Sequence, residues 1–140
     1  MAGKADFTED EWETMHRGVT GAGMLVALSD PGFTDSFKES SAMAKHMAGA
    51  QTTATSQLVR ELAAVRGTGW KVMSKPQEVR DGTVAALSSS VAVLTTKAPD
   101  DVENYRAFVV ELAQAVAAAA SGGDEVESAA IATIRDALGS

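Results

Sequence analysis

The sequence contains no cysteine, few aromatic residues and no long apolar run. Without cysteine it can form neither a disulfide framework nor a thiolate metal site, and nothing ties it to an oxidising compartment. Its apolar runs, of which residues 24–28 and 115–120 are the longest, are far shorter than the roughly 20 residues of a membrane-spanning helix. The N-terminus also lacks the apolar segment of a signal peptide. We therefore expect a cytoplasmic location and no contact with a membrane.

Positive charge is also scarce. The formal net charge is −7 and the isoelectric point is about 4.7. Because nucleic-acid phosphates are repelled by an acidic protein at long range, this balance argues against binding to DNA or RNA.

The chain has the length and apolar content of one globular domain. Its 140 residues, 45% of them hydrophobic, suffice for one continuous core. We expect a single helical domain over residues 1–140, with residues 1–6 as a disordered N-terminal tail. Since only 5% of residues are aromatic, the core should be built from small side chains around seven aromatic anchors: Phe7, Trp12, Phe33, Phe37, Trp70, Tyr105 and Phe108.

Apolar residues recur at helical spacing along most of the chain. The first helix is predicted over residues 8–28, because Thr8 and Glu11 have the spacing of a capping box. Proline, glycine and capping residues mark the other helices. These are expected over about 34–48, from Thr55 or Ser56 to about 66, from a Ser74 cap to about 96, over 99–120 and over 124–138, with a short loop at 51–56 and a strand as the alternative for 91–96. Together they predict an all-α fold, an antiparallel bundle of five to six helices.

Three glycines fall inside the first predicted helix: Gly18, Gly21 and Gly23. Glycine destabilises a helix, so it is typical of places where another backbone approaches closely. We therefore expect the first helix to be central.

One acidic cluster has the spacing of a metal site. Asp124, Glu125 and Glu127 follow two glycines, and such carboxylates can collect a divalent cation such as Ca²⁺ or Mg²⁺. The same spacing is that of a helix cap, with Asp124 as the capping residue, and this is the interpretation we favour. Apart from a metal ion, no cofactor is indicated.

The two histidines lie near methionines. Met15 adjoins His16, and Met43 and Met47 flank His46. If the two helices met in register, these side chains could bind copper. Packing or surface roles are the alternative.

Basic residues surround the glycines before Trp70. Arg66 and Lys71 are the nearest, and the group could hold an anion or a stacked base. A solvated corner between helices is the alternative interpretation. Trp70, with Arg66 and Lys71, is the best candidate for a partner-binding site.

Both ends of the chain resemble a known kind of protein. Residues 7–12 (Phe-Thr-Glu-Asp-Glu-Trp) are similar to the opening of small bacterial helical proteins, and residues 97–105 and 126–138 are similar to their last two helices. More loosely, these segments resemble tellurite-resistance TerB-like domains. The resemblance implies an all-α bundle and, in the TerB-like case, metal binding by acidic residues, for which the region Asp124 to Glu127 offers a match.

We see no nucleophile or acid–base pair arranged for catalysis, so we expect no enzyme. The leading hypothesis is a noncatalytic interaction domain that binds a protein partner or forms a homodimer, through Trp70 or the glycine face of the first helix. The alternative is a metal-associated stress-response protein that uses the acidic cluster.

Overall fold

The computed structural model describes residues 3–29, 36–65, 75–119 and 124–139, and for residues 29, 36–42, 76, 119 and 124–128 only the backbone. The described residues form an all-α helical bundle without a strand. Its elements are η1 (Lys4–Asp6), α1 (Glu9–Ser29), α2 (Ser36–Thr53), α3 (Gln57–Ala63), α4 (Pro76–Lys97), η3 (Pro99–Asp101), α5 (Val102–Ala119) and α6 (Asp124–Leu138). The strand considered for residues 91–96 is wrong, because α4 continues through them.

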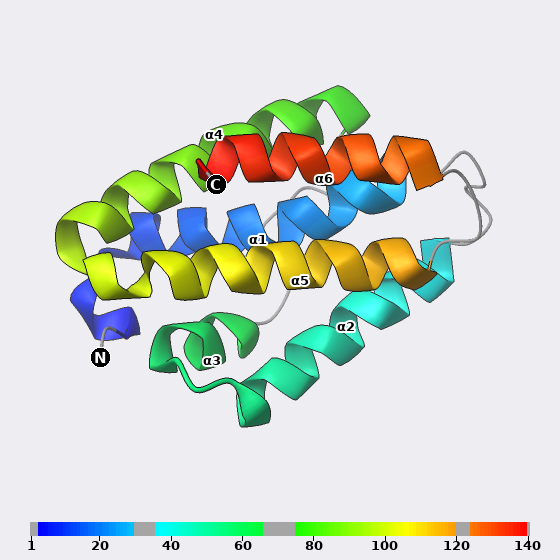
Figure 1. Ribbon diagram of the computed structural model, residues 1–140. Helices are drawn as coiled ribbons and strands as arrows, with labels where there is room; N and C mark the ends of the chain where they lie inside the picture. The colour runs from blue at the N-terminus through cyan, green and yellow to red at the C-terminus, as the bar shows by residue number, and fades with distance from the viewer. Residues whose placement is uncertain (1–2, 30–35, 66–74, 120–123, 140) are drawn as a thin grey trace.

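Helix α1 is central, as its glycines predict. It packs against α4, α5, α6 and α2, and Figure 1 shows α4, α5 and α6 lying alongside it. The buried apolar side chains of these helices form one cluster. Its fully buried members include Val19 of α1, Leu58 of α3, Leu87 of α4, Leu112 of α5 and Ile134 of α6.

Two of the three glycines in α1 permit a close approach. A Cβ atom added at Gly18 would lie 2.6 Å from the Tyr105 hydroxyl oxygen, and one at Gly23 would lie 2.6 Å from the Met43 sulfur atom. Gly21 is buried. At Gly18 and Gly23 the close neighbours are side chains of other helices rather than the backbone that the glycines predict.

Local signals place several helix ends. The Thr8 amide donates to Glu11 Oε1 at 2.8 Å, and the Glu11 amide donates to Thr8 Oγ1 at 3.1 Å. This reciprocal pair is the predicted capping box. At the other end of the chain, Gly139 follows α6 with a φ angle of +74°, a conformation that glycine adopts without strain.

Other boundaries differ from the prediction. Helix α2 continues through Gly49 to Thr53, so the predicted end at 48–49 is wrong and the loop at 51–56 is shorter. A single glycine lowers helix stability by only about 1 kcal/mol, which neighbouring residues offset. The predicted Ser74 cap of α4 is also wrong. The capping position is Lys75, whose side chain makes no capping hydrogen bond.

The N-terminal segment also differs from the expected tail at residues 3–6. Lys4–Asp6 form a 3-10 turn, and the Lys4 amide donates to Glu61 Oε2 at 2.5 Å. Contact with α3 therefore orders residues that carry no helical signal of their own.

Three of the seven predicted aromatic anchors are buried: Trp12, Tyr105 and Phe108. Phe7 is half-buried and lies against Trp12, with ring centroids 6.0 Å apart. The side chains of Phe33, Phe37 and Trp70 lie outside the described part of the structure.

None of the described helices combines the length and the apolar character needed to cross a bilayer.

Candidate functional site

The residues chosen from sequence for partner and metal binding fall where the structure gives no side chains. Trp70, Arg66 and Lys71 lie outside the described residues. Helix α6 begins at Asp124, and the side chains of Asp124, Glu125 and Glu127 lie outside the described part of the structure. Within the described residues, no three His, Asp or Glu side chains gather closely enough to hold a metal ion.

The two histidines have different surroundings. His16 is only 3% exposed, and its Nε2 atom has no hydrogen-bond partner among the described residues. Burial lowers the pKa of His16, although the Glu13 carboxylate acts in the opposite direction. His46 is half-buried, and its ring stacks on Phe108 with centroids 6.1 Å apart and 18° between the planes. His46 lines the groove described next.

A groove of about 660 Å³ lies between α2, the start of α3 and α5. Its volume falls within the usual range of ligand sites. Along α5 it follows one face from Asn104 to Ala115, a distance of about 16 Å at the helical rise per residue. We call it the α2–α5 groove, and its lining residues are Lys45, His46, Gly49, Ala50, Thr53, Ala54, Thr55, Ser56, Val59, Asn104, Ala107, Phe108, Glu111 and Ala115.

Helices α2 and α5 run in opposite directions along the groove (Figure 1). At one end of the groove, where α2 stops and α5 starts, a contact joins Ser56 to Asp101. The Ser56 hydroxyl donates to Asp101 Oδ1 at 3.3 Å, and its oxygen accepts the Val59 amide at 3.3 Å as the cap of α3. The link between α2 and α3 therefore closes one end of the groove.

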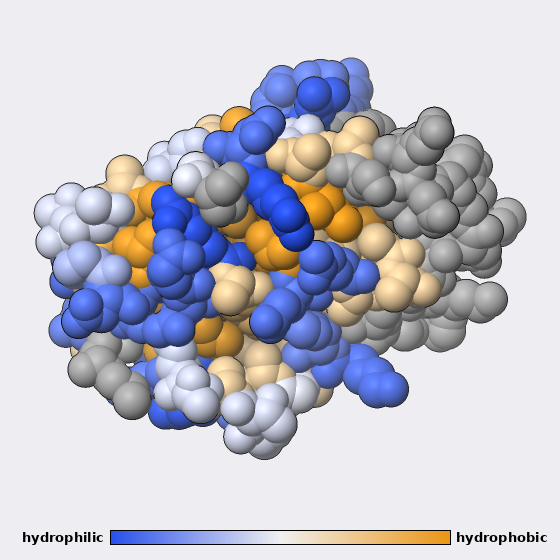
Figure 2. Space-filling model, viewed as in Figure 1, coloured by the Kyte–Doolittle hydropathy of each residue, from blue (hydrophilic) through white to orange (hydrophobic). Residues whose placement is uncertain are grey.

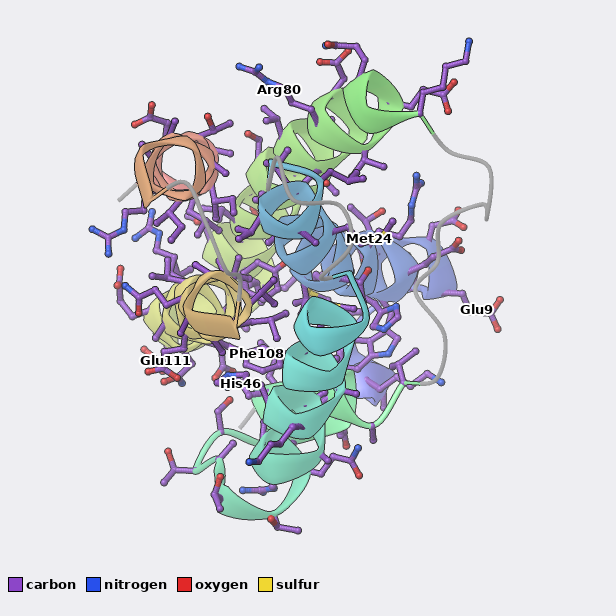
Figure 3. The ribbon with its side chains drawn as sticks, turned by 90° about the vertical axis from the view of Figure 1, so that its right-hand side faces the viewer. Glu9, Met24, His46, Arg80, Phe108 and Glu111 are labelled. Atoms are coloured by element: carbon purple, nitrogen blue, oxygen red, sulfur yellow. The ribbon has the colours of Figure 1, made fainter. Side chains whose placement is uncertain are left out.

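Small side chains and one aromatic pair form the groove walls. Gly49 and Ala50 line it on α2, and Ala107 and Ala115 line it on α5; such small residues leave room for another chain. In Figure 3, His46 and Phe108 lie together between the two helices, with Glu111 farther out on α5. Apolar surface between charged side chains is also visible on the α5 face in Figure 2.

The groove combines apolar walls with a polar rim. Lys45 and Glu111, both exposed, supply charge near the open end, and Asn104 supplies an amide at the closed end. Ligand and peptide sites have this character, in which apolar area gives affinity and a few polar groups give orientation.

The sequence does not reveal this groove. Its patterns predict Phe108 as a core residue and allow His46 a metal role, but Asn104 and Glu111 stand out in no pattern. One available signal was Gly49, which lies in a helix although a Cβ atom there would meet nothing within 4 Å. A helical glycine without a close neighbour leaves an open surface.

Comparisons with protein families, curated proteins and solved structures found no match. The resemblance to TerB-like domains therefore stays a prediction.

Proposed function

We propose that this protein is a noncatalytic interaction domain of the cytoplasm that binds a short amphipathic helix of a partner protein in the α2–α5 groove. The observation that carries this proposal is the groove itself, with a volume of about 660 Å³ between two helices. Amphipathic helices bind in such grooves by inserting apolar side chains spaced three and four residues apart.

The dimensions of the groove support a helix. Its α5 wall spans residues 104–115, about three helical turns. The alanines and Gly49 allow the backbone of the partner to approach, while Phe108 and His46 offer an aromatic surface for an apolar anchor. Phe108 is itself 3% exposed and lies at the floor of the groove, so the half-buried His46 is the more exposed of the two rings.

Charge supports a protein partner over a nucleic acid. The net charge of −7 repels phosphates, and lining residues Lys45 and Glu111 carry opposite charges.

A display selection of random amphipathic helical peptides against the intact protein tests the proposal. Binders are then measured against Ala107→Trp, which fills the groove, and against Ala92→Trp, a matched change at an exposed position on α4. We expect the dissociation constant to rise by about tenfold or more in Ala107→Trp.

The Ala92→Trp variant should bind within about twofold of the wild type, because isolated surface changes have small effects. Peptides that bind equally well to both variants would contradict the proposal. Self-association through the groove is a separate outcome, recognised in sedimentation as a dimer that Ala107→Trp dissociates.

A further inference from the structure

The described side chains of α2, residues 43–53, rest on the bundle, and none of them is buried. The half-buried ones share one face of the helix and are Met43, His46, Met47 and Ala50. In this part of α2, the hydrogen bond to a neighbouring helix goes to α3, from Gln51 Nε2 to the Ala63 carbonyl oxygen at 3.0 Å. Apolar and aromatic contacts therefore attach these residues to α1 and α5.

Met43 contacts α1 through its sulfur atom. A Cβ atom added at Gly23 would lie 2.6 Å from that sulfur and 3.7 Å from Val116 Cγ2. Because real Cβ atoms essentially never come within 3.0 Å of such a neighbour, the sulfur occupies the space that a side chain at position 23 would fill. Val116 is 1% exposed. The Met43 sulfur therefore lies in an apolar junction of α1, α2 and α5.

The thioether of Met43 suits this junction because it accepts hydrogen bonds only weakly. Peroxides change that property by oxidising the sulfur. A sulfur lone pair attacks one oxygen of hydrogen peroxide, and the O–O bond breaks. The attacked oxygen stays on the sulfur, which is oxidised by two electrons, while the other leaves as hydroxide and takes up the proton to become water. The product, methionine sulfoxide, is polar and carries an oxygen that accepts hydrogen bonds.

Exposure distinguishes Met43 from the methionine at the centre of the bundle. Met15 is 0% exposed, so peroxide does not reach its sulfur in the folded protein. Met43 is half-buried, as are Met24 and Met47. A reagent can therefore reach Met43 from solvent, although the sulfur packs against Gly23.

From this geometry we infer that Met43 is a site of reversible oxidation by peroxides, and that its sulfoxide releases α2 from α1. Gly23 lies inside α1, where backbone amides are used by the hydrogen bonds of the helix. A sulfoxide oxygen in the junction therefore lacks a donor, and a buried acceptor without a donor is unfavourable. Because Lys45, His46 and Gly49 of α2 line the α2–α5 groove, release of α2 also removes one wall of the groove.

Hydrogen exchange of the α2 amides, before and after treatment with hydrogen peroxide, tests the inference. Mass spectrometry of peptides measures the extent of oxidation at each methionine in the same samples. We expect oxidation of Met43 to raise the exchange rates in α2 by about tenfold or more, the scale of one unsatisfied polar group. Exchange in α4 should not change, and reduction by methionine sulfoxide reductases should restore the original rates in α2.

Met43→Leu removes the sulfur and keeps the volume of the side chain nearly constant. In this variant, peroxide should leave the exchange rates of α2 unchanged. Met47→Leu is the matched control, because Met47 is also half-buried and lies one turn farther along the same face. Peroxide should accelerate exchange in Met47→Leu as it does in the wild type. Met43→Gln, which places a polar amide in the junction, should accelerate exchange in α2 without peroxide.

Three results would overturn the inference. One is equal acceleration of α2 exchange in the wild type and in Met43→Leu, because another methionine would then be responsible. The second is unchanged exchange in α2 although Met43 is oxidised, and the third is resistance of Met43 to peroxide under conditions that oxidise Met24. None of these results bears on peptide binding in the α2–α5 groove, which Ala107→Trp tests separately.

Discussion

The Tyr105 hydroxyl group donates a hydrogen bond of 2.8 Å to the carbonyl oxygen of Met15, 90 residues earlier in the chain. Both side chains are fully buried. Burial raises the pKa of Tyr105 well above its usual value, so the hydroxyl keeps its proton and remains a donor. This bond joins α5 to the central helix at the point where Gly18 leaves room for the tyrosine.

Substitution of Gly18 tests this packing. A Cβ atom at Gly18 would lie 2.6 Å from the Tyr105 hydroxyl oxygen and 3.0 Å from Leu87 Cδ2. Overpacking of a core costs about 1–3 kcal/mol, more than alanine gains over glycine in a helix, about 1 kcal/mol. We expect Gly18→Ala to lower the free energy of unfolding by about 1–2 kcal/mol, measured by urea denaturation.

Gly49→Ala is the matched control. Gly49 is also helical, and a Cβ atom there would meet nothing within 4 Å. Alanine should therefore raise the free energy of unfolding by about 0.5–1 kcal/mol. Equal stabilisation by both substitutions would show that α1 is not held closely at Gly18.

Substitution of Ser56 tests the closed end of the groove. Ser56 caps α3 and donates to Asp101, so Ser56→Ala removes two hydrogen bonds. We expect the free energy of unfolding to fall by about 1–2 kcal/mol. Thr55, the other residue predicted as a possible cap, is exposed, and Thr55→Ala should change stability by less than about 0.5 kcal/mol. A larger loss of stability in Thr55→Ala than in Ser56→Ala would assign the cap to Thr55.

His16 makes stability depend on pH. Its pKa is lowered from 6.5, chiefly by burial and against the opposing effect of Glu13, so the unfolded chain binds this proton more readily than the folded protein does. The contribution of neutral His16 to the free energy of unfolding is complete above pH 6.5. It is lost as the pH falls from 6.5 to the pKa of His16 in the folded protein. Because His16 binds one proton, it cannot change the free energy of unfolding by more than about 1.4 kcal/mol per pH unit.

His16→Met isolates this contribution, because methionine fits apolar surroundings and does not titrate. Urea denaturation of both proteins between pH 7.5 and 4.5 is the measurement, with the pH range set about the ordinary histidine pKa. We expect the wild type to lose more stability than His16→Met below pH 6.5. Parallel curves for the two proteins would show that His16 titrates equally in the folded and unfolded states.

Helix type and several helix ends were predictable because their causes are local. The capping box of Thr8 and Glu11 acts across three residues, and the apolar stripe of α5 repeats within one helix, so both are visible in the sequence. The end of α2 was not predictable from Gly49, because a weak local signal was outweighed by the surrounding helix.

The groove depends on contacts between distant segments. Ser56 and Asp101 are 45 residues apart, and His46 meets Phe108 only because α2 and α5 lie side by side. Contacts between distant segments leave no periodicity or short motif in the sequence. Local composition alone therefore points to Trp70 and to the acidic cluster at Asp124.

The sequence by itself determined the all-α character, the capping box at Thr8 and the close approach at Gly18, since hydrogen-bonding spacing and side-chain size act over a few residues. Tertiary structure alone decided that Asn104 turns its amide nitrogen to Asp101 and that Phe108 forms the floor of a groove. The physical reason is that a binding surface is defined by which helix faces remain uncovered, and that depends on the packing of the whole chain.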